Sequence, residues 1–159
     1  LLISMIIIIT GTPGTGKTKV AKELAKHLSY TYFDLNVFIK KNKLYESYNK
    51  KLKTYEVNTK NLNKEIKKIL NKKNMIIDSH LSHDIDKKYV DLCIVTKCSI
   101  PILKQRLKKR KYPKEKTQEN IDAEIFDVCY NEAKEKGYKI IILNTILRII
   151  TNQHIHCKI

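Results

Sequence analysis

The segment that most constrains this chain is GTPGTGKT at residues 11–18. It directly follows an apolar run at residues 3–9 and leads into an amphipathic stretch at residues 17–28. The pattern GxxxxGKT between a strand and a helix is typical of a P-loop, in which backbone N–H groups and the helix N-terminus surround a phosphate. The sequence therefore predicts a nucleotide-binding loop, with an ordinary glycine turn as the alternative.

The spacing gives each residue of this loop an expected role. Gly14 and Gly16 allow the backbone to turn its amides inward, and Lys17 is expected to reach the β- and γ-phosphates as a catalytic residue. The hydroxyl of Thr18 is expected to ligate Mg²⁺. We therefore expect ATP and Mg²⁺ as the ligands of this loop.

Further candidate residues follow the apolar run at residues 75–77. Asp78 ends that run, at the position where P-loop proteins hold Mg²⁺, and a simple turn residue is the alternative. His80 and His83 come next. A histidine there orients water or a phosphate near neutral pH, unless both are ordinary surface residues.

Two of the three arginines in the chain, Arg106 and Arg110, lie four residues apart in a lysine-rich segment. On a helix this spacing places both side chains on one face. Guanidinium groups bind phosphate with two parallel hydrogen bonds and stabilise the charge that spreads in phosphoryl transfer. We predict a catalytic clamp, with an exposed helix end as the alternative.

Short apolar runs alternate with longer amphipathic stretches, which predicts an α/β fold with a parallel sheet. Strands are expected at residues 3–9, 30–33, 75–77, 89–95 and 139–143. Helices are expected at residues 17–28, after an N-cap at Thr59, after Ser99, and at residues 117–136 before Gly137. The last helix is expected to turn Ile121, Ile125, Val128 and Cys129 inward. The expected architecture is a P-loop NTPase three-layer fold with a five-stranded parallel sheet, forming a single domain over residues 1–159.

The net charge of +16 is concentrated in two segments. Residues 40–73 hold twelve lysines and three glutamates, and residues 104–116 hold eight basic residues and one glutamate. This focusing predicts two surfaces that meet nucleotide phosphates or nucleic acid, although solvated helix faces remain the alternative. Residues 42–58 and 110–116 coincide with these segments, lack periodicity, and are expected to be loops or arms outside the core.

Composition and missing motifs narrow the class of protein. No run is long enough to span a membrane, no signal peptide is recognisable, and the four cysteines show no CxxC spacing, so a reducing cytoplasm is expected. No NKxD motif of a GTPase is present, and an AAA-type ATPase is expected to need a longer chain. A small nucleotide kinase, with one arm for the acceptor and one over ATP, fits better.

Four ordered blocks carry a resemblance to a known family: GTPGTGKT at 11–18, LYESY at 44–48, IIDSHLSHD at 76–84, and RKYPKEKTQENIDAEIFDVCYNEA at 110–133. Over about residues 5–145 the chain resembles the adenylate kinase isoenzyme six family, also called coilin-interacting nuclear ATPase. The resemblance implies transfer of the ATP γ-phosphate to AMP with Mg²⁺, giving two ADP, and some ATP hydrolysis. It also implies a role in late small ribosomal subunit maturation, with a small-subunit ribosomal protein and rRNA as partners.

The same resemblance places an NMP-binding arm at about residues 34–57 and a LID at about residues 109–119. It implies ATP contacts at Gly14, Gly16, Lys17, Thr18, Lys19 and Arg110, a catalytic segment containing Asp78 and His80, and acceptor binding by Asp34 and Lys40. The arm contains no arginine, so Lys40 would have to bind the AMP phosphate without a planar fork. The tail at residues 146–159 does not follow the family pattern.

Three functions are compatible with these patterns. The first is a nucleoside monophosphate kinase, which the P-loop, the arginines and the two arms favour. The second is an ATPase-driven ribosome assembly factor with incidental kinase activity, which the focused basic charge favours. The third is a kinase of another small acceptor, such as a different nucleotide or shikimate.

Overall fold

The computed structural model describes residues 4–51, 54–70 and 74–145, so the tail at residues 146–159 lies outside the described part. The strands are β1 (Ile6–Thr10), β2 (Thr31–Asp34), β3 (Tyr45–Asn49), β4 (Thr54–Val57), β5 (Met75–Asp78), β6 (Leu92–Lys97) and β7 (Ile140–Asn144). The helices are α1 (Lys17–Leu28), α2 (Leu35–Lys41), α3 (Thr59–Ile66), α4 (Ile100–Lys109), α5 (Lys114–Ile125) and α6 (Val128–Glu135), with 3-10 turns η1 (Ser82–Asp84) and η2 (Lys87–Tyr89).

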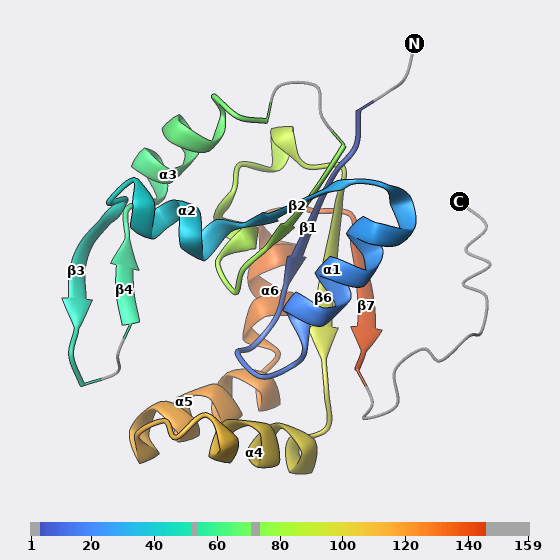
Figure 1. Cartoon of the computed structure of the whole chain (residues 1–159). Helices are drawn as coiled ribbons and strands as arrows, with labels where there is room; N and C mark the ends of the chain where they lie inside the picture. Colours follow the sequence, from blue (N-terminus) through green and yellow to red (C-terminus); the bar gives the residue numbers. More distant parts are fainter. Residues whose placement is uncertain (1–3, 52–53, 71–73, 146–159) are drawn as a thin grey trace.

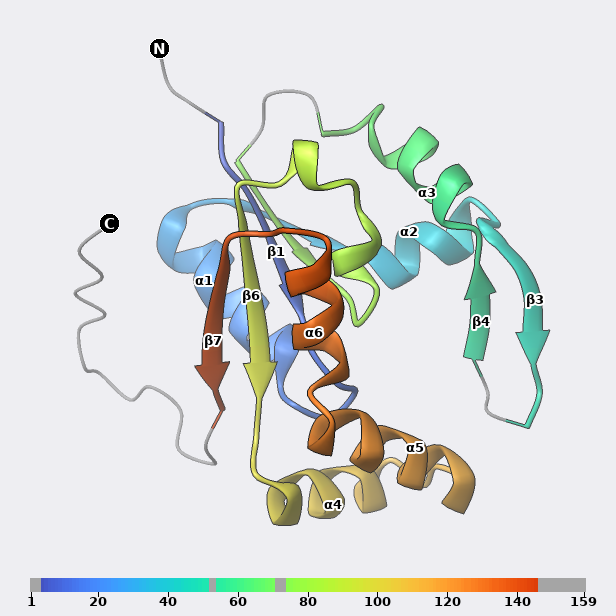
Figure 2. The ribbon, with the colours of Figure 1, turned by 180° about the vertical axis from the view of Figure 1, so that it is seen from behind.

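Five strands form one parallel sheet in the order β2-β5-β1-β6-β7, as the sequence predicted. The central strand β1 is buried along its whole length, which its run of four isoleucines allows. Ile6 and Ile8 point to the face covered by α2, α3 and α6, whereas Ile7 and Ile9 point to the face covered by α1. The predicted three-layer fold is confirmed (Figures 1 and 2).

A smaller apolar cluster lies beyond the carboxyl ends of the strands. Helices α4 and α5 pack against each other there through Leu103, Leu107 and Ile121. In Figure 1 the two helices lie past the arrowhead of β6, while the β3–β4 hairpin lies at the left, next to α2. Both elements therefore flank the edge of the sheet at which ligands bind in open α/β folds.

The helix predicted at residues 117–136 is in fact two helices. Asp127 adopts a left-handed backbone with φ 53° between α5 and α6, although neither Gly nor Pro marks the break. The break is needed because α5 packs on α4, whereas α6 packs on the sheet through Ala133. Consequently Ile125 is 54% exposed and Val128 is 36% exposed, so the predicted inward face is wrong at these two positions.

The two basic segments predicted to be loops or arms outside the core are largely regular elements. Residues 42–58 contain the antiparallel β3–β4 hairpin, whose tyrosines stack across it with ring centroids 4.5 and 4.8 Å apart. In the other segment Arg110 caps α4, and α5 already begins at Lys114. Cross-strand aromatic pairs stabilise the hairpin although its residues show no alternation of burial.

Candidate active site

A cleft of about 840 Å³ opens at the carboxyl ends of β1 and β5. The P-loop, α2, the β3–β4 hairpin, the segment after β5, and the ends of α4 and α5 all contribute to its wall. Ten of the residues that the sequence analysis named as candidates line it: Gly14, Gly16, Lys17, Thr18, Lys19, Lys40, Asp78, His80, His83 and Arg110. Residues from five separate segments of the chain thus meet in one cavity.

The P-loop is held in shape from below by the sheet. Gly11 has φ 138°, and a Cβ atom there would lie 2.4 Å from the carbonyl oxygen of Thr96. The hydroxyls of Thr15 and Thr96 are 2.7 Å apart, and the Thr15 hydroxyl also donates to the Thr12 carbonyl at 2.8 Å. This close approach requires glycine at position 11, which explains the first glycine of the motif physically.

Lys17 lies at the N-terminus of α1 and points into the cleft. Its ammonium donates to the Thr12 carbonyl oxygen at 3.1 Å. Burial, helped by the nearby charge of Arg110, lowers the Lys17 pKa to about 8, although Asp78 and Glu124 act in the opposite direction. A cation that is partly desolvated and faces another cation is suited to a site that receives an anion.

Asp78 combines burial with an unused oxygen. The side chain is 3% exposed, and its Oδ2 accepts a hydrogen bond from the Tyr32 hydroxyl at 3.1 Å. Its Oδ1 is buried and has no hydrogen-bond partner. A buried carboxylate oxygen of this kind is costly unless a cation or a water satisfies it.

These oxygens fit a nucleotide-borne Mg²⁺. Asp78 and the exposed Thr18 both line the cleft and supply the hard oxygen ligands that this ion prefers. Among the residues that the structure describes, no group of three or more His, Cys, Asp or Glu side chains could hold a metal. Mg²⁺ commonly takes only one or two protein ligands and completes its shell with phosphate and water, so a sparse site is what the ion requires.

His80 and His83 follow Asp78 but lie in different surroundings. His80 lines the cleft, and burial followed by the charge of Lys17 lowers its pKa to about 4. Its ring is therefore neutral at physiological pH and has a nitrogen that accepts hydrogen bonds. His83 is only 4% exposed, so the surface alternative is wrong for this residue.

His83 connects the end of β1 to α6. Its Nδ1 lies 2.6 Å from the Thr10 hydroxyl, and its Nε2 lies 2.7 Å from a carboxylate oxygen of Glu132. Lys136 donates to its carbonyl oxygen at 2.9 Å. Because Thr10 immediately precedes the P-loop, this network fixes the segment after β5 relative to that loop.

The structure separates the two arginines predicted as one clamp. Arg110 lines the cleft and donates to the Tyr112 hydroxyl at 3.3 Å. Arg106 lies behind the P-loop, where it donates to the Gly14 carbonyl at 3.1 Å and to the Thr145 hydroxyl at 3.3 Å. In this arrangement Arg106 supports the loop, and Arg110 is the arginine that faces the cavity.

The remaining predicted residues lie toward the rim or outside the cleft. Lys40 lines the cleft with its ammonium 5.4 Å from the Tyr55 ring centroid, and Lys19 is exposed with Glu23 at 3.9 Å. Asp34 caps α2 by accepting from the Val37 amide at 3.0 Å and lies off the cleft wall.

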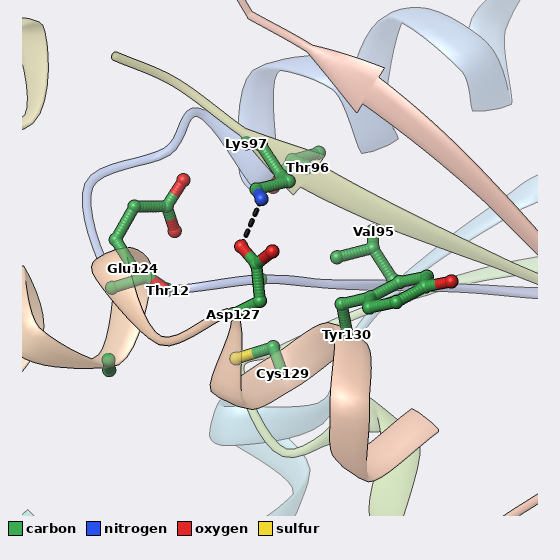
Figure 3. A pocket seen from close by; sticks show the side chains of 10 residues that line it. Thr12, Val95, Thr96, Lys97, Glu124, Asp127, Cys129 and Tyr130 are labelled. Carbon is green, nitrogen blue, oxygen red and sulfur yellow. Dashed lines mark hydrogen bonds and ion pairs between the residues drawn. The ribbon is translucent and has the colours of Figure 1, made fainter. Parts of the chain in front are cut away.

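A much smaller cavity of about 10 Å³ lies beneath the P-loop (Figure 3). Thr12, Glu124 and Cys129 line it, and an ion pair between Lys97 and Asp127 crosses its wall. Its volume matches about one water molecule. The ion pair also binds Asp127, the left-handed residue between α5 and α6, so this cavity lies beside the break between the two helices.

Several residues in or beside the cleft were not found by sequence reasoning. Tyr32 donates to Asp78 from outside the cleft wall, Tyr55 lines the cleft on the hairpin side, and Glu132 both lines the cleft and binds His83. On α5 a buried polar stripe of Lys116, Asn120 and Glu124 lies beside the buried Ile121. The stripe was detectable, since its members are four residues apart, whereas Tyr32 and Tyr55 carried no local signal.

Comparison with known proteins decides the family. A family model described as an AAA domain matches residues 7–127. A putative adenylate kinase of Methanocaldococcus jannaschii is 40% identical over 150 residues, which are 94% of this chain and 83% of that protein. The adenylate kinase isoenzyme 6 homolog of Dictyostelium discoideum is 32% identical over 133 residues, covering 84% and 75% of the two chains. The chain belongs to this isoenzyme 6 family.

Solved structures show the same fold. A shikimate kinase from Bacteroides thetaiotaomicron matches with a TM-score of 0.55 at 15% identity, covering 88% of this chain and 85% of that one. A deoxyadenosine kinase from M. mycoides matches with a TM-score of 0.54 at 21% identity, covering 87% and 90%. This chain therefore has the fold of P-loop kinases. The matched model is described as an AAA domain and lies within residues 7–127, so a domain of that description fits within this chain.

Proposed function

We propose that this protein is a nucleoside monophosphate kinase of the adenylate kinase type, which transfers the γ-phosphoryl group of ATP to AMP and yields two ADP. The carrying observation is one cleft that runs from the P-loop to the hairpin wall at Lys40 and Tyr55. At about 840 Å³ its volume suits ligands larger than a single small metabolite. Relatives named putative adenylate kinase support this reading.

In the proposed reaction the protein positions the phosphates and stabilises their charge. Lys17 and the P-loop amides hold the β- and γ-phosphates, and Arg110 neutralises charge from the opposite wall. Thr18 and Asp78 would hold Mg²⁺, which would supply positive charge beside the phosphates when bound. A deprotonated oxygen of the AMP phosphate attacks the γ-phosphorus of ATP. The bond from that phosphorus to the oxygen bridging the β- and γ-phosphates breaks, and the donor leaves as ADP with that oxygen.

Acceptor selection is proposed to depend on the hairpin. Lys40 and Tyr55 form a cation–π pair on the cleft wall, which offers a charge for the acceptor phosphate and a ring for its base. Asp34 stays in the proposal as an acceptor-site residue through its capping of α2, the helix that carries Lys40. Lysine lacks the fork of arginine, so we propose loose rather than strict selection of the acceptor phosphate.

The test is an acceptor panel with ATP and Mg²⁺ in which ADP formation is measured with AMP, the other nucleoside monophosphates and shikimate. AMP-dependent ADP formation that Lys17→Ala abolishes supports the proposal. Formation of ADP with shikimate and not with AMP would assign the chain to another kinase class. ATP loss without any acceptor measures the accessory hydrolysis that we also propose.

A second candidate function is favoured by the charge that the cleft does not use. Lysines of α3 and the hairpin tip, such as Lys60, Lys64 and Lys50, are exposed and lie outside the cleft wall. We propose that this surface binds rRNA or a small-subunit ribosomal protein during ribosome maturation. Pull-down with purified small-subunit components across a salt titration tests this role, and no retention at low salt would eliminate it.

The compartment is a further part of the proposal. The described cysteines Cys93, Cys98 and Cys129 are free, which suits a reducing cytoplasm. In the described part of the chain, no helix is both long enough and apolar enough to cross a membrane.

A further inference from the structure

An amide side chain on the wall of the cleft has no role in the function proposed above. Asn36 lies in the first turn of α2 and lines the cleft, and Lys40 follows four residues later on the same helix. Residues with this spacing share one face of a helix, so both side chains face the same part of the cavity. The acceptor side of the cleft therefore carries an amide one helical turn from its cation.

The sheet places Asn36 beside the end of the cleft that holds Asp78. Strands β2 and β5 run in parallel, with Asp34 opposite Asp78 in the register. Asn36 follows the end of β2 and Ser79 directly follows the end of β5, and the Ser79 hydroxyl donates to the Asn36 Oδ1 atom at 2.9 Å. The amide is thus bound to the residue next to the proposed Mg²⁺ ligand, whereas Lys40 lies about 6 Å farther along the helix axis.

Hydrogen bonding determines which end of the Asn36 amide faces Ser79. The Ser79 hydroxyl accepts from the Leu81 amide at 3.0 Å, and Ser79 is only 1% exposed. Its single hydrogen needs an acceptor, because a buried donor without a partner is costly, and Asn36 Oδ1 supplies one. With the amide reversed, the hydroxyl would have no acceptor for that hydrogen among the described residues. The amide oxygen therefore faces Ser79, and the NH₂ group points away from it.

The NH₂ group of Asn36 is available to a ligand in the cleft. Asn36 lines the cleft and Ser79 does not, so the amide lies between Ser79 and the cavity. In the described part of the chain, no side chain or backbone group accepts a hydrogen bond from Asn36 Nδ2. Two N–H donors beside a cation match the oxygens of a phosphate group.

We infer that Asn36 is a specificity-determining residue that donates from its Nδ2 group to the phosphate of the acceptor nucleotide. Ser79 acts as its positioning residue, and Lys40 supplies the charge that an amide lacks. The amide and the ammonium together present separate donors where a guanidinium would present a planar fork. This inference rests on the proposed kinase function and assigns the site to an acceptor that carries an anionic phosphate.

The experiment compares Asn36→Asp with Asn61→Asp. Both residues lie in the first turn of a helix and both changes add one negative charge, but Asn61 on α3 is exposed and lies outside the cleft wall. Aspartate at position 36 keeps an oxygen for Ser79 and replaces the donor end by an anion. We expect Asn36→Asp to lower kcat/KM for AMP about 100-fold and to change KM for ATP less than about threefold, because the like charges meet at the acceptor phosphate. Asn61→Asp is expected to stay within about twofold for both substrates, because an exposed charge is screened.

Ser79→Ala tests the positioning role. Loss of the hydroxyl leaves the Asn36 amide free to rotate and should raise KM for AMP about threefold. In an Asn36→Ala background the same change should leave KM for AMP unaltered, because Ser79 acts through the amide. A merely structural effect, such as loss of the contact with the Leu81 amide, would be equal in both backgrounds and would overturn the role of Ser79.

A binding measurement separates this inference from the kinase proposal. Calorimetry with AMP, on protein saturated with a non-hydrolysable ATP analogue and Mg²⁺, should show at least about tenfold weaker binding to Asn36→Asp than to Asn61→Asp. If the wild-type protein transfers no phosphoryl group to AMP yet this difference is found, the kinase proposal fails and the Asn36 site stands. If the wild-type protein is active with AMP and the two variants behave alike, the Asn36 inference is overturned. Absence of AMP binding to the wild-type protein would overturn it as well.

Two controls keep the outcome clear. Equal losses in Asn36→Asp and Asn61→Asp that disappear at high salt would show a general effect of charge and would overturn the inference. Should Asn36→Asp fail to fold, Asn36→Ala removes the donors without adding a charge. A loss of about tenfold in kcat/KM for AMP relative to Asn61→Ala then supports the inference, and equal values overturn it.

Discussion

The lowered Lys17 pKa predicts an alkaline limit for ATP capture. Burial and the Arg110 charge lower this pKa from its ordinary value of 10.5 to about 8. The protonated form is the one that binds phosphate, so the competent fraction of free enzyme falls as pH rises through this value. From pH 7 to pH 9 that fraction drops from about 0.9 to about 0.1, which is about a tenfold loss.

The assay is kcat/KM for ATP measured between about pH 6.5 and about pH 9.5, because this ratio reports the ionisation of the free enzyme. We expect a break near pH 8 and about a tenfold decline per unit above it. The profile of kcat should break at a higher pH, since bound phosphates stabilise the Lys17 ammonium and raise its pKa.

The Arg110→Gln variant tests whether the Arg110 charge contributes to the lowered Lys17 pKa. Removing the guanidinium removes one of the two effects that lower the Lys17 pKa, so the break in kcat/KM should move to higher pH even though the rate itself falls. A profile that stays flat to about pH 9.5 would refute the assigned pKa. A break at an unchanged pH in Arg110→Gln would refute the part assigned to Arg110.

Three further substitutions test other contacts of the site. Gly11→Ala places a methyl group 2.4 Å from the Thr96 carbonyl oxygen at a residue with φ 138°. It should lower the free energy of unfolding, measured by urea titration, by about 2–4 kcal/mol. A loss below about 1 kcal/mol would contradict this contact. Tyr32→Phe removes the hydrogen bond to Asp78 and should raise the Mg²⁺ concentration needed for half-maximal activity about threefold or more, which a Mg²⁺ titration at fixed ATP measures. His80→Ala should lower kcat more than it lowers ATP affinity, and equal kcat in the two proteins would remove His80 from the reaction. The pH profile of kcat of the unmutated protein should show no break near pH 6.5, because the His80 pKa is about 4.

The sheet and the P-loop were predictable because their signals are local and strong. Buried parallel strands read as continuous β-branched runs, and four isoleucines end in a glycine-rich loop at the start of α1. The positions of β1, β2, β5, β6 and β7 therefore agree with the predicted strands within a few residues. Gly137, expected to end the last helix, lies just after α6 and has a left-handed backbone with φ 74°.

The errors arose where tertiary contacts override the local pattern. The break at Asp127 is set by the different partners of α5 and α6, and an ion pair with Lys97 stabilises it. The β3–β4 hairpin depends on cross-strand tyrosines, which no run within either strand reveals. Asn58, one residue before the predicted Thr59, caps α3 through its side chain.

The site shows the same limit at the level of single residues. Helical spacing correctly placed Arg106 and Arg110 near one helix end, but it could not show that the P-loop would lie beside Arg106 and occupy it through the Gly14 carbonyl. The sequence did not reveal that Lys116 is buried in the cleft wall, because a lysine in a basic segment is normally interpreted as a solvated residue.

The distribution of charge follows from this arrangement. Lys40 approaches the cleft from α2, Arg110 and Lys116 approach it from the α4–α5 side, and Lys17 lies between them on α1. Cations on opposite walls repel each other, and a polyphosphate bound between them would reduce that repulsion. The charge that appears as two separate basic segments in the sequence is therefore, in part, one site divided between two walls, and its cations are expected to bind phosphate cooperatively rather than one by one.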